Sequence, residues 1–429
     1  MLYLKDKFII LLIFCLSLLL YGCETTQLTP KKTLTHNQIQ LLETIQEEED
    51  DPDTQENKLI KKDNEILRIG LLLPLSGEFY QIGKSLLDAA QLALEKTNNK
   101  NLEFYIIDTG EEDQLYKNLS YLINNNVDLI FGPIFTKTVL KVKEYLDDQN
   151  IPIITFSNNS DVSDRNVYVF GLTIEDELNS IYEYSINKGI NRFAVIVPDN
   201  KYGNKVKNEI NRLYNVNNNS SSKFIFYPTI DPDYYKIARE VSNYDERKLD
   251  LDNRVKLLEE LQSESSLKEL KLLRNKDTLG DLDFEAILII ARSFSELTNF
   301  ISILPYYDVD PKKVKFIGNY IWGKELILKE PSMRNSYFSS LDLNAQEKFK
   351  EEYKKIYKNN PHSLAPLAYD LVGLISSLNI EHKKITRKIL HSNLGYMGIN
   401  GWFRFDESGR VERRPIIFHV GSDKFVIKN

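Results

Sequence analysis

One segment combines glycine, lysine and serine at a spacing that could hold a phosphate group. Gly77 and Gly83 are followed by Lys84 and Ser85, between an apolar stretch and an amphipathic one, and Asp108 imitates a magnesium-holding acid. Five residues separate the glycines, whereas the loop that binds nucleoside triphosphates needs four, so its amides would not close around the phosphates. We therefore reject a nucleotide site. We expect only that a helix begins at Gly83 with free amides suited to an anionic group.

The other residue types that carry out chemistry show no catalytic spacing. The sequence has neither the G-x-S-x-G turn of serine hydrolases nor the H-E-x-x-H helix of zinc peptidases. Glu175, Asp176 and Glu177 are interpreted as acids at a helix start, where they favour the macrodipole. We expect no enzyme activity, metal or cofactor, although distant catalytic groups could still meet in the fold. The five histidines are scattered: His36, His362, His382, His391 and His419.

Composition narrows the function further. The 429 residues carry 55 basic and 62 acidic side chains, a net charge of −7, with no basic tract to neutralise phosphates. A nucleic-acid-binding role is therefore not expected. Both cysteines, Cys15 and Cys23, lie near the N-terminus, so the rest of the chain has no disulfide and no thiol nucleophile. The length favours two or three domains.

The first residues are typical of an export signal. Lys5 and Lys7 precede an apolar run over 8–21, which fits a secretory signal and is shorter than the ~20 residues of a membrane span. Its end, LYGC at 20–23, resembles the lipobox of bacterial lipoproteins. The resemblance implies a signal peptide over 1–22 and lipidation of Cys23. An uncleaved N-terminal anchor is the alternative, and both place the body outside the cytoplasm.

Residues 23–65 show no periodic pattern. Eight acids lie between Glu43 and Glu56 and repel one another, which extends the chain. We predict a disordered acidic tether between the anchor and the body.

From residue 67 onward, short apolar strands alternate with amphipathic helices. The strand-like segments include LRIGLLLPL, LEFYIIDTG, VDLIFGP and IPIITFS, and the pattern restarts with RFAVIVPDN at 192–200. This alternation indicates an α/β fold in which parallel sheets are covered by helices on both faces. Near the C-terminus, GWFRFDESGRVERRPIIFHV predicts two strands around a Glu-Ser-Gly turn.

Residues 245–282 form an additional charged segment, rich in Leu, Lys and Glu. Leu251, Val255, Leu258 and Leu261 recur at helical spacing, which predicts one or two surface helices. Such helices either pack on their own lobe or form a surface that binds a partner.

Several segments together resemble a known family. RIGLLLPLSGEFYQIG, VDLIFGPIFT, IPIITFSNN and VPDNKYG are similar to type I periplasmic binding proteins, and the similarity extends over residues 66–429. The resemblance implies two doubly wound parallel-sheet lobes joined by three crossovers, with ligand held at the carboxyl ends of the strands. The expected lobes consist of 66–170 with 319–392 as lobe 1, and 171–318 with 393–429 as lobe 2, which contains the insertion 245–282.

The same resemblance implies a set of cleft residues. The tyrosine that closes over the ligand corresponds to Tyr202. Where amino-acid-binding members have an acid for the ligand's ammonium group, this chain has Tyr320. That replacement argues against tight binding of a free amino acid, because a buried ammonium needs a carboxylate partner. The candidate cleft residues are Ser76, Gly83, Thr136, Ser157, Asn158, Asn159, Tyr202, Arg292 and Tyr320.

A narrower resemblance concerns function. IGNYIWG, FKEEYKKIYKNNP, LAPLAYDLVGL and GYMGINGWFRF are similar to the LpoA-type lipoprotein activators of penicillin-binding proteins. The resemblance implies a non-catalytic periplasmic protein, lipid-anchored to the outer membrane, whose partner is a bifunctional penicillin-binding protein, the peptidoglycan synthase. Some LpoA-type proteins carry an N-terminal helical-repeat domain, where this chain has the acidic tether. The alternative is a solute-binding protein of an amino-acid importer, closing on a small polar ligand. The third and least favoured hypothesis is that the protein is an enzyme.

Overall fold

A computed structural model describes residues 66–216, 222–334, 336–382 and 385–427. The expected signal peptide, Cys23 and the acidic tether lie outside these residues. No helix in the described ranges is both long and apolar enough to cross a membrane.

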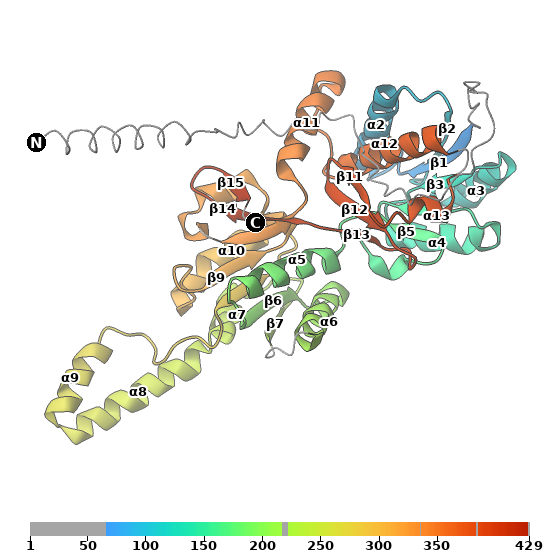
Figure 1. The fold of residues 1–429 in the computed structure, drawn as a ribbon. Helices are drawn as coiled ribbons and strands as arrows, with labels where there is room; N and C mark the ends of the chain where they lie inside the picture. The colour runs from blue at the N-terminus through green and yellow to red at the C-terminus, as the bar shows by residue number, and fades with distance from the viewer. Residues whose placement is uncertain (1–65, 217–221, 335, 383–384, 428–429) are drawn as a thin grey trace, which may run out of the picture. The chain divides into compact units, whose positions relative to one another are not determined.

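The first sheet has five strands, all parallel, in the order β2-β1-β3-β4-β5 (Figure 1). One face of it packs against α2, α11 and α12, and the other against α3 and α4. We call this sheet and its helices lobe 1. The strands are β1 (Leu67–Leu73), β2 (Leu102–Asp108), β3 (Leu129–Phe131), β4 (Ile153–Thr155) and β5 (Val167–Val169). The helices are α2 (Tyr80–Thr97), α3 (Leu115–Asn124), α4 (Thr136–Leu146), α11 (Leu343–Tyr357), α12 (Ala365–Glu381) and α13 (Arg387–Leu390).

The second sheet has seven strands in the order β15-β14-β10-β9-β8-β6-β7, and β14 and β15 are antiparallel to their neighbours. Along β8, Ala286 and Leu288 pack towards α5 and α6, whereas Ile287 and Ile289 pack towards α7 and α10. We call this sheet and its helices lobe 2. The strands are β6 (Phe193–Pro198), β7 (Lys223–Tyr227), β8 (Ala286–Ile289), β9 (Lys315–Gly318), β10 (Tyr337–Ser340), β14 (Ile416–Val420) and β15 (Phe425–Ile427). The helices are α5 (Ile174–Asn187), α6 (Lys201–Val216), α7 (Tyr234–Val241) and α10 (Phe294–Ile303).

Both sheets are thus covered by helices on both faces, which confirms the predicted α/β fold of two doubly wound lobes. Two of the expected boundaries are wrong. Residues 319–340 stay with lobe 2, because β10 pairs with β9 on one side and β14 on the other. Residues 393–413 belong with lobe 1, because Tyr396, Phe403 and Val411 lie in its core. These residues form a small antiparallel sheet of β11 (Tyr396–Gly398), β12 (Gly401–Phe405) and β13 (Val411–Arg413), with the expected turn at 406–409.

The two lobes use glycine in the same way where a strand leads into a helix. A Cβ on Gly83 of α2 would lie 2.0 Å from the carbonyl oxygen of Pro74, and a Cβ on Gly203 of α6 would lie 1.9 Å from that of Pro198. Only glycine allows the helix backbone to approach the strand end so closely. Each helix therefore begins in direct contact with its strand.

The insertion forms two helices, α8 (Tyr244–Leu261) and α9 (Glu264–Leu273), which pack on each other. Leu251, Val255 and Leu258 face the contact between them, as the helical spacing predicted. Leu261 does not, because 59% of its surface is exposed.

Candidate functional site

Lobe 1 contributes small polar side chains from the loops that follow β3 and β4. Thr136 is the first residue of α4, and its Oγ1 accepts a hydrogen bond from Asn159 Nδ2 at 3.4 Å. Ser157 Oγ accepts from the backbone N–H of Asn159 at 3.1 Å. The structure thus brings together Thr136, Ser157 and Asn159. Asn158, between them in sequence, is exposed to solvent.

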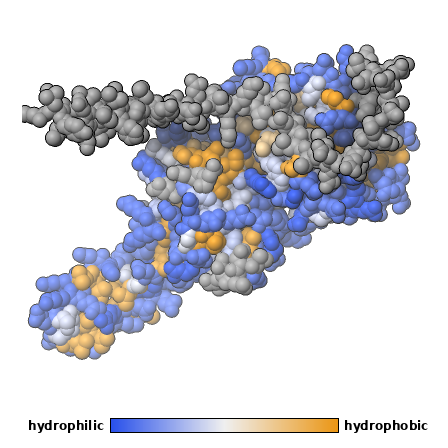
Figure 2. All heavy atoms as spheres, in the orientation of Figure 1, coloured by the Kyte–Doolittle hydropathy of each residue, from blue (hydrophilic) through white to orange (hydrophobic). Residues whose placement is uncertain are grey.

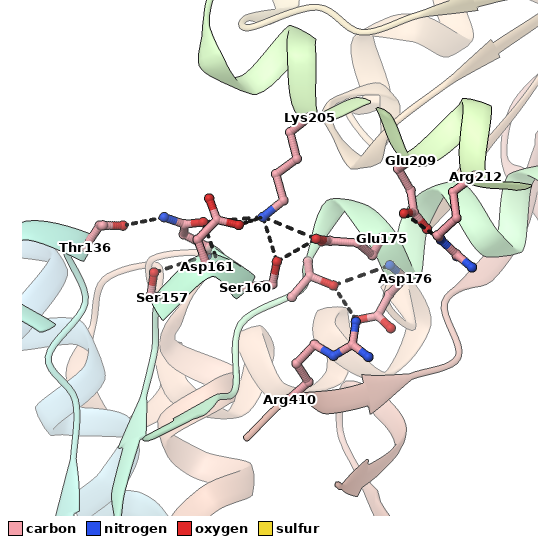
Figure 3. A network of polar contacts seen from close by, with 12 residues as sticks. Thr136, Ser157, Ser160, Asp161, Glu175, Asp176, Lys205, Glu209, Arg212 and Arg410 are labelled. Atoms are coloured by element: carbon pink, nitrogen blue, oxygen red, sulfur yellow. Dashed lines mark hydrogen bonds and ion pairs between the residues drawn. The ribbon is translucent and has the colours of Figure 1, made fainter. Parts of the chain in front are cut away.

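Lobe 2 reaches this loop with a lysine that was not among the candidate residues. Lys205 of α6 donates from Nζ to Ser160 Oγ at 2.6 Å and to Asp161 Oδ1 at 2.9 Å (Figure 3). Its Nζ also lies 3.4 Å from Asn159 Oδ1 and 3.2 Å from Glu175 Oε1. We call Asn159, Ser160, Asp161, Glu175 and Lys205 the interlobe cluster. The cluster joins a loop of lobe 1 to two helices of lobe 2.

A second group on lobe 2 surrounds a buried acid. Glu177 is 2% exposed, and its Oε1 accepts the backbone N–H of Tyr320 at 2.8 Å. Burial raises the pKa of this carboxyl to about 8, so it is mostly protonated at neutral pH. Burial, with Glu177 nearby, also raises the pKa of the Tyr202 hydroxyl. Tyr202 and Tyr320 therefore lie near one acid, Glu177, although position 320 itself is a tyrosine.

The three remaining candidate residues make other contacts. Arg292, which lies just before α10, forms an ion pair with Glu296 of that helix, and its guanidinium lies over the ring of Tyr227. Ser76 lies in the loop after β1 and hydrogen-bonds to the carboxylate of Asp108, which also accepts the backbone N–H of Leu75 at 2.7 Å. These partners of Arg292 and Ser76 all lie outside the interlobe cluster.

The expected anion site at Gly83 is wrong. Helix α2 begins at Tyr80, three residues earlier than predicted, so the Gly83 N–H donates to the carbonyl of Phe79 at 3.2 Å. That amide is therefore not free for a ligand. Ser85 Oγ accepts the N–H of His362, which ties α2 to the segment before α12. Gly83 and Ser85 are thus explained by the close packing of α2 on the end of β1 and on the segment before α12.

Sequence reasoning missed the roles of the three consecutive acids at the start of α5. Glu175 reaches Lys205, Glu177 is buried against Tyr320, and Asp176 accepts the backbone N–H of Arg413 at 3.3 Å. A helix turns by about 100° per residue, so three adjacent side chains point in three directions. The sequence held one signal of these roles. The N-cap Thr173 accepts the backbone N–H of Asp176 and so caps the helix by itself, which leaves the three acidic side chains available for other contacts.

Arg413 lies where the chain crosses between the lobes. Its Nε and Nη2 donate to the carbonyl of Phe170 at 3.2 and 2.6 Å, and its guanidinium lies 4.4 Å from the Phe170 ring centroid. Burial lowers its pKa to about 10, against the opposing effects of Asp370 and Asp176, and it stays charged at neutral pH. Burial raises the pKa of each of these carboxyls to about 6. We call Asp176, Asp370 and Arg413 the crossover cluster.

In the interlobe cluster, the short distance between a serine and a lysine is the one feature that resembles a catalytic site. A serine hydroxyl 2.6 Å from a lysine could form a nucleophile and base pair. Ser160, however, donates to Glu175 Oε1 at 2.5 Å, and Lys205 is engaged as a cation by two carboxylates. A lysine ammonium held in this way donates hydrogen bonds to its neighbours and has no lone pair with which to accept a proton from the serine. Within the described ranges, no three His, Cys, Asp or Glu residues lie where they could hold a metal ion.

The fold and the site together define a class of protein. The chain belongs to the periplasmic binding protein family, which matches residues 66–403. This result confirms the resemblance to that family.

Individual relatives are more distant. The penicillin-binding protein activator LpoA of Photobacterium profundum is 22% identical over 73% of this chain and 50% of its own length. The chain spans between 50% and 61% of the length of the curated relatives it matches. The C-domain of LpoA from Haemophilus influenzae, a regulator of PBP1A, superposes with a TM-score of 0.60 at 17% identity, covering 84% of this chain and all of that domain. A leucine-binding protein of Thermotoga maritima gives 0.53 at 15% identity, covering 85% and 98%.

Proposed function

We propose that this protein is a non-catalytic, lipid-anchored periplasmic activator of a peptidoglycan synthase, a bifunctional penicillin-binding protein. In this function the two lobes form a body that contacts another protein and carries no reaction of its own. Lipidation at Cys23 would anchor it, with the outer membrane as the proposed site and residues 23–65 as the tether.

The interlobe cluster is the observation that carries the proposal. In a solute receptor, polar groups at the facing edges of two lobes are kept for the ligand. Here Asn159, Ser160 and Asp161 of lobe 1 bond to Lys205 of lobe 2, and Glu175 shares the same lysine. The polar groups of the two lobes thus satisfy one another's hydrogen bonds and charges, with no need of a bound solute. The sequence similarity to LpoA adds support of a second kind.

The proposal is tested by adding the purified full chain to the purified penicillin-binding synthases of the same organism. We expect the rate of glycan polymerisation from lipid-linked precursor to rise with at least one synthase. The matched control is the same chain unfolded by heat, which should have no effect. If none of the synthases binds the chain or changes its rate, the proposal fails.

An importer receptor remains the second candidate, and two observations favour it. The structural likeness to a leucine-binding protein is one. The other is the presence of groups on lobe 1 that could contact a solute: the exposed Asn158 after β4, and the rings of Phe79 and Phe135, whose centroids lie 4.5 Å apart. Calorimetric titration with leucine, isoleucine and valine separates the candidates, because the activator should give no heat. Micromolar binding that Asn158→Ala abolishes would favour the importer.

A further inference from the structure

The helices α8 and α9 form a hairpin that extends from lobe 2 beyond α7 (Figure 1). Its interior is a separate small core, made by Leu251, Leu258, Leu270 and Leu273. None of these residues is part of the two cores that cover the faces of the lobe 2 sheet. The lobe therefore has its own complete core, and packing within the lobe does not explain the hairpin.

The base of the hairpin is fixed to the lobe. Arg247 donates to the carbonyl of Gly280 at 2.9 Å and lies 3.4 Å from a carboxylate oxygen of Asp308. Thr278 Oγ1 donates to the same carboxylate at 2.6 Å, and the rings of Tyr244 and Tyr307 meet edge to face at 5.0 Å. A surface held in one orientation loses little conformational freedom on binding, which favours affinity.

Leucine side chains are exposed along this hairpin to an unusual degree. Eight leucines are exposed in the part of the chain that the structure describes, and five of them lie on α8 and α9. Figure 2 shows the resulting hydrophobic areas on the hairpin. Concentrated apolar exposure marks surfaces that bind a partner. The five residues and their exposed fractions are Leu249 59%, Leu257 46%, Leu261 59%, Leu267 54% and Leu272 71%.

The charges of the hairpin indicate the kind of partner. Residues 244–279 carry nine acids and eight bases, so the hairpin is close to neutral. Several of these charges pair within the hairpin, as Arg254 does with Glu269 at 2.7 Å. An anionic lipid surface or a nucleic acid would call for an excess of positive charge. Apolar side chains among balanced charges fit the surface of another protein, with an apolar centre and a mixed polar rim.

We infer that the exposed leucines of α8 and α9 form the surface that docks on the protein partner, at an apolar patch of the penicillin-binding synthase. The inference rests on the proposed function, which supplies the identity of the partner. The proposed function requires that some surface of the two lobes contacts the synthase, and we assign that contact to the hairpin.

The test compares two variants of the full chain in detergent. One carries Leu249→Gln, Leu261→Gln and Leu272→Gln on the hairpin. The matched control carries Leu140→Gln and Leu326→Gln, which are 49% and 55% exposed and lie elsewhere. The Kd for the purified synthase should rise about tenfold or more in the hairpin variant and stay unchanged in the control. Both variants should keep the wild-type Tm, because all five positions are exposed.

Three results would overturn the inference. Equal affinity of wild type and hairpin variant would remove the surface assignment and leave the proposed function intact. Failure of the wild type to bind any synthase would remove both. Vesicles of phosphatidylethanolamine and phosphatidylglycerol provide the third arm. If the hairpin substitutions abolish vesicle binding while synthase binding persists, the surface faces lipid and the inference is wrong.

Discussion

Two charged groups connect the lobes, and they differ mainly in their access to water. In the crossover cluster, Arg413 is 3% exposed and Asp370 is 2% exposed. In the interlobe cluster, 21% of the Lys205 side chain and 73% of the Asp161 side chain are exposed. Water screens the second group and not the first, so a similar set of charges should have different effects on stability. We therefore expect the crossover cluster to contribute more to the stability of the fold than the interlobe cluster does.

The largest effect is expected for Arg413→Met. Its removal would leave the Phe170 carbonyl without its guanidinium donors and two carboxylates without their nearby cation. Breaking a buried charge pair in this way costs about 3–5 kcal/mol of unfolding free energy. Urea denaturation at pH 7 measures the loss.

Arg410→Met is the matched control for that substitution. Arg410 is 55% exposed at its side chain and lies 3.8 Å from Asp406. Its loss should change the unfolding free energy by about 0–1 kcal/mol. Equal losses in the two variants would contradict the contrast between the clusters.

An effect of comparable size, which depends on pH, is expected at Glu177. Its pKa rises from 4.5 to about 8 on folding, so the folded state binds the proton more tightly than the unfolded state. This carboxyl therefore stabilises the fold fully below pH 4.5, and the contribution is lost as the pH rises through 8. At about 1.4 kcal/mol per pKa unit, the difference between 4.5 and about 8 corresponds to a loss on the order of 5 kcal/mol.

Glu177→Gln should remove that pH dependence, since the amide oxygen can still accept the Tyr320 N–H and carries no charge. The measurement is the unfolding free energy of variant and wild type at pH 5 and pH 9. The variant should gain relative to wild type at pH 9. The exposed Glu183→Gln on the same helix is the control. Parallel pH profiles of wild type and Glu177→Gln would show that the carboxyl is not buried in solution.

The smallest effect on stability is expected for Lys205→Met, roughly 1 kcal/mol, because its contacts are partly in water. Its effect on the separation of the lobes should be clearer. Spin labels placed at the exposed positions 117 and 208, on α3 and α6, report that distance. We expect a broader and longer distribution in the variant. The exposed Lys201→Met should leave it unchanged, and an unchanged distribution in Lys205→Met would show that this lysine does not hold the lobes together.

The sequence predicts the strand and helix alternation well, because each lobe buries its sheet on both faces and leaves continuous apolar strands. It does not predict that β10 extends the second sheet. The segment YFSS at 337–340 looks half polar, yet all four residues are buried, because β10 lies inside the sheet and both faces of that sheet are covered. Pairing between distant segments is not written in the local pattern. The expected boundaries near 319 and 393 were wrong for this reason.

The candidate site was predicted in part. Thr136, Ser157 and Asn159 meet because the carboxyl ends of β3 and β4 are neighbours in a parallel sheet. Lys205 and Glu177 could not be predicted, because their partners lie on other elements and at least about 30 residues away in the sequence. A helix-start acid and a surface lysine have the same local sequence whether they face water or another lobe.

The order in which lobe 1 is assembled has a consequence for the newborn chain. Helices α11 and α12 cover α2 and the first sheet, and their contacts, such as Tyr353 of α11 with Asp88 and Asn379 of α12 with Asn99, span more than 260 residues. A ribosome that has finished only the first 300 residues holds the five strands with one face covered by α2 alone. The amino-terminal lobe must wait for nearly the whole polypeptide, so completion of synthesis, and not the emergence of each strand, sets when it can fold.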